Sequence, residues 1–236
     1  MSVQPTPASP QGTPASPQAA GGSVPDTAPT QAGAPRPTPQ PPPPLGQPGR
    51  EVFTASFSDP ARTGLQFLGP PSTSSGVEAG AYWISVGAQW QAGWAAAPGS
   101  QGDFIAETDV APSGNSQERG HGLAFRINQD GNRPPSYYLF WMNPAGPQYA
   151  LHRVDQGQFN ELIAWRRHQA LRGEGEPNKM TVRAKGSTLD LYINEQPVAS
   201  ATDDTIKEGR VALYLSAWSI PGVRTDFLSF KVWQAN

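Results

Sequence analysis

Residues 122–165 read GLAFRINQDGNRPPSYYLFWMNPAGPQYALHRVDQGQFNELIAW, a run of short segments in which apolar and polar residues alternate. Clusters of Gly, Pro, Asn and Asp separate the segments. Because successive side chains of a β-strand point to opposite faces, this alternation predicts strands with one buried and one wet face. The run therefore predicts four antiparallel strands, at 121–128, 136–142, 148–154 and 158–165.

The same alternation of apolar and polar residues continues on both sides of this run. No stretch keeps a helical period over three turns. The nearest helical pattern, residues 159–172, is interpreted as a strand that runs into a turn. Many short strands separated by turn signals are typical of β-sandwiches and barrels, so the sequence predicts an all-β, antiparallel domain. The other predicted strands are 51–57, 81–87, 103–110, 178–185, 188–194, 196–201, 209–216 and 223–233.

The motifs in these strands resemble those of a known family. Residues 122–165 carry G-L-x-F-R followed by Y-Y-x-F, a run common in bacterial concanavalin A-like, laminin-G-like jelly-roll modules. Residues 53–60 fit the usual first strand, 177–204 resemble a central segment, and 208–218 and 223–233 resemble the closing strands. The resemblance implies a concanavalin A-like jelly-roll β-sandwich, related to the 3-keto-disaccharide hydrolase-like sandwich family. That fold hosts lectins, hydrolases, adhesive modules and sensor domains, so it leaves the function open.

The first 50 residues have a different composition from the rest of the chain. They hold 15 of the 27 prolines and none of the 22 aromatic residues. Such a segment buries too little apolar surface to offset the entropy of ordering, so residues 1–50 are predicted to be a disordered Pro/Ala/Thr/Ser/Gln-rich linker. Residues 51–236 are then the jelly-roll domain. The alternative for the linker is that PQPPPPLGQP (39–48) serves as a ligand of an SH3-like or WW-like domain.

Composition also excludes several classes of protein. The net charge of −2 offers no basic footprint for nucleic acid, and no apolar run is long enough for a transmembrane segment. The absence of cysteine excludes disulfides and thiolate metal sites. The first residues show no signal-peptide pattern. From the linker composition we expect an extracytoplasmic or cell-surface location, with a cytoplasmic location as the alternative.

Catalytic signals are incomplete. Glucanases of this architecture carry E-x-D-x-x-E on one strand, where the carboxylates share a face. Here Glu107 and Asp109 match the first two positions, and Pro112 stands at the third. We therefore expect a non-catalytic protein, with a glycoside-processing hydrolase as a less favoured alternative. The three histidines are widely spaced and predict no metal cluster.

No cofactor is expected. The resemblance to laminin-G-like modules implies calcium as the one alternative, at a rim of the sandwich where loops gather hard oxygen ligands. The calcium candidates are Asp59, Asp203 and Asp204. No spaced D-x-D-x-D loop accompanies them, and ordinary turn residues are the simpler interpretation.

Aromatic residues off the core face are the best candidates for a ligand site. In residues 136–142, Tyr137 and Trp141 alternate onto the face opposite the core, and Arg126 and His152 are predicted on the same face of neighbouring strands. Flat rings with hydrogen-bond donors around them suit the apolar faces and hydroxyls of sugars. A second pair, Trp90 and Trp94, is predicted in a Gly/Ala-rich loop. The alternative is that this second face is covered and forms a minor core.

These observations predict a binding module on a flexible stalk. Its expected partner is a polysaccharide or another cell-envelope component. The alternative is a structural subunit of a cell-surface assembly, which uses the sandwich to dock other envelope proteins. The identity of the ligand, the oligomeric state and any calcium dependence stay open from the sequence.

Overall fold

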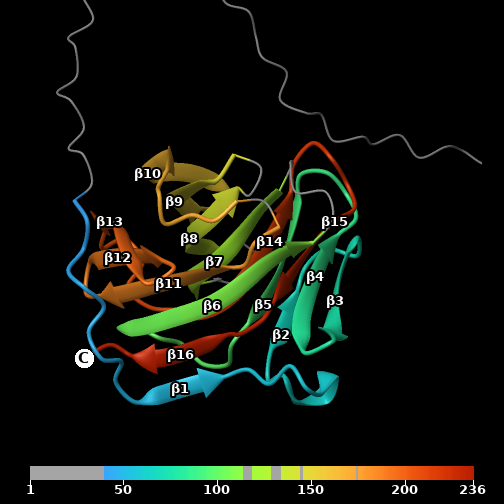
Figure 1. The fold of residues 1–236 in the computed structure, drawn as a ribbon, viewed down its shortest axis with the longest axis horizontal. Coiled ribbons are helices and arrows are strands. Elements are labelled where there is room, and N and C mark those ends of the chain that lie inside the picture. Colours follow the sequence, from blue (N-terminus) through green and yellow to red (C-terminus); the bar gives the residue numbers. More distant parts are fainter. Residues whose placement is uncertain (1–39, 114–118, 129–133, 144–145, 174) are drawn as a thin grey trace, which may run out of the picture. The chain divides into compact units, whose positions relative to one another are not determined.

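A computed structural model describes residues 40–236, apart from 114–118, 129–133, 144–145 and 174. Two antiparallel sheets pack face to face, with β6 and β11 in one layer and β7, β8 and β14 in the other (Figure 1). The strand order is β13-β12-β11-β6-β15-β4-β3 in the nine-stranded sheet, where β1 and β16 pair off this path. It is β10-β9-β8-β7-β14-β5-β2 in the seven-stranded sheet.

The nine-stranded sheet comprises β1 (Glu51–Thr54), β3 (Thr73–Glu78), β4 (Ala81–Val86), β6 (Phe104–Ser113), β11 (Asn178–Lys185), β12 (Thr188–Ile193), β13 (Gln196–Thr202), β15 (Val223–Phe227) and β16 (Lys231–Gln234). The seven-stranded sheet comprises β2 (Gln66–Leu68), β5 (Gln91–Ala96), β7 (Arg119–Asn128), β8 (Ser136–Asn143), β9 (Gln148–Asp155), β10 (Gln158–Arg167) and β14 (Arg210–Ala217). The helical element of the described residues is the short 3₁₀ turn η1 (Pro60–Arg62), and no helix there has the length and apolarity to cross a membrane.

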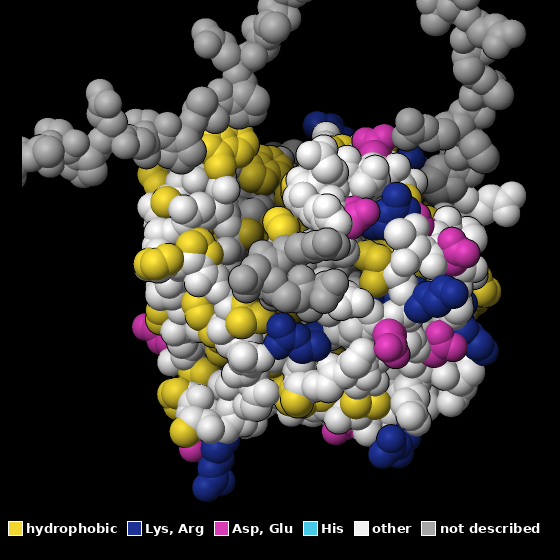
Figure 2. All heavy atoms as spheres, turned by 180° about the vertical axis from the view of Figure 1, so that it is seen from behind, with side chains coloured by type: hydrophobic (Ala, Val, Ile, Leu, Met, Phe, Trp, Pro, Cys, Tyr) yellow, Lys and Arg dark blue, Asp and Glu magenta, His cyan; other side chains and the backbone are white. Residues whose placement is uncertain are grey.

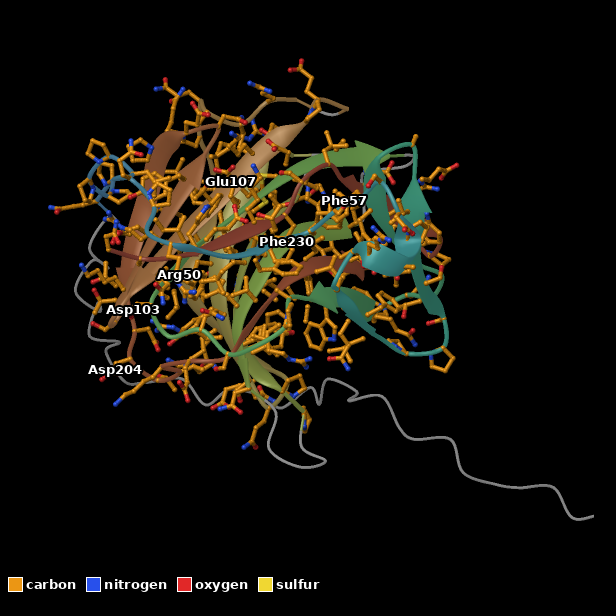
Figure 3. All side chains as sticks on the ribbon, turned by 90° about the horizontal axis from the view of Figure 1, so that it is seen from below. Arg50, Phe57, Asp103, Glu107, Asp204 and Phe230 are labelled. Atoms are coloured by element: carbon orange, nitrogen blue, oxygen red, sulfur yellow. The ribbon has the colours of Figure 1, made fainter. Side chains whose placement is uncertain are left out.

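The core lies between the two sheets and follows the predicted alternation. On β8, Tyr138, Phe140 and Met142 point inward and are buried, as predicted. In the view from below, Phe57 and Phe230 also lie in this interior (Figure 3). Burial of such large apolar side chains supplies about 1.5–3 kcal/mol each, which makes this layer the main source of stability.

Every predicted strand is present, but the sequence pattern missed β2, β3 and β5. β5 reads QAGWAA, where small residues hide the alternation. The small residues have a packing reason: a Cβ at Gly93 would sit 3.3 Å from atoms of both Ile84 and Phe67. The predicted strand 223–233 is also two strands, β15 and β16.

A bulge in β7 reverses the predicted faces at its end. Arg126 adopts a left-handed backbone with φ of 50°, and the pairing with β8 shifts between Phe125 and Asn128. One extra residue in a strand turns all later side chains to the other face. Ile127 therefore joins the outer face with Ala124, instead of the core with Phe125. The sequence alternation could not reveal this bulge, because a non-glycine residue occupies the left-handed position.

Residues 40–50 pack on the sandwich, and we call them the proline strap. The carbonyl of Gln40 accepts a hydrogen bond from the Ser200 N–H at 3.1 Å, and Tyr192 donates its hydroxyl to the Pro43 carbonyl at 2.8 Å. Further along, the Gly49 N–H donates to the Gln234 carbonyl at 3.0 Å. The strap thus belongs to the packed domain rather than to the predicted linker. For residues 1–39, which lie outside the described residues, the linker stays a prediction.

Candidate ligand-binding site

The outer face of the seven-stranded sheet carries a second apolar cluster, separate from the core between the sheets. It forms because every second residue of these strands faces outward, as Tyr137, Leu139 and Trp141 do on β8. Rings from neighbouring strands then meet, and the ring centroids of Trp141 and Tyr214 lie 6.3 Å apart. We call this cluster the aromatic face. Its rings are those of Trp94, Tyr137, Trp141, Trp165, Tyr214 and Trp218.

Trp141 is the centre of the aromatic face, and glycine makes room for it. A Cβ at Gly120 on β7 would overlap the Trp141 ring, with Cζ3 only 2.8 Å away, so the absence of a side chain lets this ring lie close to the strand. The indole Nε1–H donates to His152 Nδ1 at 3.0 Å, which fixes the orientation of the ring. Trp141 is only 8% exposed and forms a rigid floor.

Part of the aromatic face opens into a groove of about 320 Å³, which we call the aromatic groove. The buried rings of Trp141 and Tyr214 form its floor. Trp90 and Phe159 are 75% and 53% exposed and stand at its rim. Seen from behind, apolar side chains gather at the upper left of the molecule, while most charged ones lie on the right (Figure 2). The groove is lined by Trp90, Gln91, Ala92, Trp141, Phe159, Tyr214, Ser216, Ala217 and Trp218.

The two tryptophans predicted in a loop have different positions. Trp90 lies in the turn before β5, with a left-handed φ of 58°, and its N–H donates to the Trp218 carbonyl at 3.1 Å. This bond ties two groove residues together. Trp94 lies within β5, so its predicted loop position is wrong. The Trp94 ring packs edge-on against the Tyr137 ring, with 5.1 Å between the ring centroids, and does not line the groove.

Tyr137 and His152 share the predicted face but support the groove from outside its lining. Tyr137 is buried between Trp94 and Tyr214, and burial raises the pKa of its hydroxyl. Burial also lowers the pKa of His152, which therefore stays neutral near pH 7 and can accept the Trp141 bond. Most of the aromatic face is therefore the covered minor core that was the alternative interpretation. The face is open to solvent at the groove, where the rim residues are exposed.

Arg126 is not on this face, and its predicted place beside Tyr137 and Trp141 is wrong. The bulge turns its side chain toward the nine-stranded sheet, where it is 1% exposed. The guanidinium donates hydrogen bonds to three carbonyls. The shortest distances are 2.9 Å to Gly102, 2.9 Å to Ile206 and 2.8 Å to Gly186. These bonds hold three loops at one end of the sandwich, which is a structural role.

Two of the three calcium candidates have other partners. Asp59 Oδ1 accepts a hydrogen bond from the Ala61 N–H at 2.9 Å and caps η1. Asp203 accepts from the Tyr138 hydroxyl at 2.6 Å and pairs with Arg153. Asp204 lies at the same end of the sandwich as Asp103 (Figure 3). Throughout the part of the chain that the structure describes, no three His, Asp or Glu side chains are grouped to hold a metal ion.

The carboxylates of the partial glucanase motif lie on the other sheet. Glu107 and Asp109 are on β6, where Glu107 Oε2 accepts from the Thr181 hydroxyl at 3.2 Å. Asp109 Oδ2 accepts from the Ser229 hydroxyl at 2.7 Å. Both act within the nine-stranded sheet, away from the aromatic groove.

Sequence reasoning missed four aromatic residues of the aromatic face and groove: Phe159, Trp165, Tyr214 and Trp218. A signal was present for Tyr214, which alternates with the core residues Leu213 and Leu215 on β14. Trp218 follows directly after that strand. For Phe159 and Trp165, the bulges in the pairing of β10 with β9 blur the alternation.

Solved structures with this architecture confirm the fold. The carbohydrate-binding module CBM66 from Bacillus subtilis is 15% identical, with a TM-score of 0.57 over 71% of this chain and 95% of that one. A Bacillus subtilis protein with a galectin-like fold is 12% identical, with a TM-score of 0.63 over 80% and 97%. A Bacillus licheniformis β-glucanase is 12% identical, with a TM-score of 0.56 over 80% and 100%.

The protein has the concanavalin A-like jelly-roll fold that its motifs predict. No protein-family model matches the sequence, and a search of the curated proteins found no match. At identities this low, the similarity shows the fold alone, and any function has to be argued from the site.

Proposed function

We propose that the protein is a non-catalytic carbohydrate-binding module that takes its ligand in the aromatic groove. The observation that carries this proposal is the groove itself, where the exposed rings of Trp90 and Phe159 stand over a buried aromatic floor. Exposed rings of this size beside a groove are typical of interaction sites. Sugar rings have apolar C–H faces that pack on aromatic rings, while the side-chain amide of Gln91 can bond the hydroxyls.

The rigidity of the floor supports a binding role. Trp141 is held by its close fit on Gly120 and by its bond to His152, and Trp90 is tied to Trp218 through the backbone. A site that is already ordered loses little conformational entropy when the ligand binds. The similarity to a solved carbohydrate-binding module is consistent with this role.

The charge of the lining supports binding without catalysis. Glycoside hydrolysis uses two carboxyl groups roughly 5–10 Å apart across the scissile bond. Among the described residues, no Asp or Glu lines the aromatic groove, and Glu107 and Asp109 belong to the other sheet. We further propose that residues 1–39 act as a spacer that presents this module at a cell surface or envelope.

The test is a binding screen of the full chain against immobilised polysaccharides, with Trp90→Ala and Phe159→Ala beside the wild type. We expect each substitution to weaken binding by about tenfold or more, since one stacked ring contributes roughly 1–2 kcal/mol. The matched control is Trp83→Ala, which removes a ring on the outer face of the nine-stranded sheet. Equal binding by all four proteins would place the site elsewhere. Binding to no polysaccharide would leave an apolar protein segment as the alternative occupant.

A further inference from the structure

The lining of the aromatic groove is uncharged. None of the described residues around it is Asp, Glu, Lys or Arg, and its polar side chains are Gln91, Ser216 and the Tyr214 hydroxyl. The remaining lining consists of aromatic rings and alanines. A ligand in this groove therefore meets rings and neutral hydrogen-bonding groups, with no cation to pair with an acidic group.

The imidazole bonded to the floor is also neutral. His152 accepts the Trp141 Nε1–H bond through Nδ1, and a protonated Nδ1 cannot accept. Burial keeps the pKa of this imidazole below its usual range, so the ring stays uncharged at pH 7. Its neighbour across the β9–β10 pair is Glu161, which adds negative rather than positive charge to this side.

Cationic side chains of the same sheet are distant or outside the lining. Arg210 lies four residues before Tyr214 on β14, about 13 Å away along the strand, and donates to Gln66. β10 carries Arg166 and Arg167 as well as Glu161, and none of the three lines the groove. Arg167 and Glu161 are exposed and of opposite sign. Exposed charges like these are screened by water and salt.

We propose that the ligand is a neutral glycan, an uncharged hexose polymer or oligosaccharide, and not a uronate or a sulfated polysaccharide. This inference rests on the proposed function and specifies the substrate class of the same groove. A carboxylate or sulfate that entered the groove would lose its hydration, and burying an ion without a partner is costly. Sites for such groups use Arg or Lys to compensate, and the described lining provides neither. A neutral sugar ring loses little by entering an apolar, aromatic groove.

The first test measures binding of the full chain to two sets of probes. The neutral set is a β-glucan, a galactomannan and a fructan; the anionic set is alginate, polygalacturonate and carrageenan. We expect binding to at least one neutral probe, with an affinity that changes by less than about twofold between low and high salt. Salt-sensitive binding to anionic probes alone would overturn the neutral assignment while the carbohydrate proposal stands. Binding to no probe of either set would contradict the carbohydrate proposal itself.

The second test places opposite charges at one position of the lining. Gln91 is half-buried in the groove, so Gln91→Glu and Gln91→Lys form a matched pair at similar side-chain size. For a neutral ligand, neither variant should strengthen binding, because both replace a neutral amide with an ion that has to lose hydration when the ligand covers it. If Gln91→Lys strengthens binding and Gln91→Glu abolishes it, the ligand is anionic and the inference is wrong. Far-ultraviolet circular dichroism and thermal melts of both variants verify that they fold.

Discussion

At the scale of single residues, the aromatic face depends on a few polar contacts beneath the rings. Without His152, the buried indole N–H of Trp141 would have no hydrogen-bond acceptor. A buried donor that loses its partner destabilises the folded state by about 1–3 kcal/mol. His152 and His121 point to opposite faces of the sheet, because His121 pairs with Met142 and Leu215 on the core side. The two histidines therefore cannot meet in one site.

His121 is expected to make the domain sensitive to acid. Burial, and next the nearby Arg119, lower its pKa to about 3. The unfolded state, with a pKa near 6.5, takes up the proton first, so stability is full above about pH 6.5 and falls as the pH drops toward 3. Between pH 7 and pH 5 this linkage amounts to about 2 kcal/mol. Urea unfolding at both pH values should show that loss in the wild type.

The control for this prediction is His121→Leu, which removes the titrating group. Among the described residues, no hydrogen bond reaches His121 Nδ1, so the substitution removes no hydrogen bond of that atom. The variant should lose clearly less stability than the wild type between pH 7 and pH 5. An equal loss in both proteins would assign the acid sensitivity to other groups.

At the scale of elements, β7 sets both the floor of the groove and the end of the core. Its glycine at position 120 admits the Trp141 ring, and its bulge at Arg126 turns one cation away from the aromatic face. The bulge leaves Ile127 on the outer face and gives the guanidinium three loop carbonyls. One strand thus explains why the groove is apolar while the adjacent end of the sandwich is polar.

Gly120→Ala should disturb the groove. The added Cβ would overlap the Trp141 ring and lie 3.3 Å from Trp218 Cζ2, so both rings must move. Overpacking of this kind costs about 1–3 kcal/mol, and ligand binding should weaken with it. Chemical unfolding and a binding titration measure the two effects. In the control Gly102→Ala, the nearest atom to the new Cβ is 3.7 Å away, and neither quantity should change appreciably. Unchanged stability and binding in Gly120→Ala would contradict the proposed packing.

The strands differ in how well the sequence predicts them. Strands with large alternating side chains, such as β8 and β12, could be predicted with their faces, because the pattern and the core agree there. β2, β3 and β5 are short or built from small residues, so their alternation carries no signal. The aromatic face could be predicted through Tyr137 and Trp141, but not its opening. That opening depends on Phe159 and on turn geometry at Trp90, which only the folded chain shows.

At the scale of the whole molecule, the domain begins before the first strand. The proline strap lies along β12, β13 and β16, and Pro42 within it is buried. The proline-rich composition predicted a linker here, because composition contains no information about hydrogen bonds to distant residues. In the fold, the Tyr192 hydroxyl and the Gln234 carbonyl bond backbone groups of the strap. The same extended conformation that suits a spacer also suits a strap, since its carbonyls stay available.

Two truncations should distinguish the contributions of the strap and of the linker to the free energy of unfolding. Removing residues 1–39 should leave the free energy of unfolding nearly unchanged, because it leaves every described strap contact in place. Removing residues 1–50 should lower it by about 1–3 kcal/mol, since several hydrogen bonds of roughly 0.5–1.5 kcal/mol each are lost and some ordering entropy is regained. Urea unfolding of the three proteins measures this. Equal stability of the two truncated forms would show that the strap contributes nothing.

The central claim is that a neutral glycan occupies the aromatic groove, and the indole N–H resonances of the full chain test it most directly. The seven tryptophans give seven reporters for a titration followed by ¹H–¹⁵N nuclear magnetic resonance. With a neutral polysaccharide that binds, the account predicts that the signals of Trp90 and Trp218 shift, while that of Trp83 on the opposite sheet stays in place. Shifts at Trp83 without shifts at Trp90 and Trp218 would contradict it.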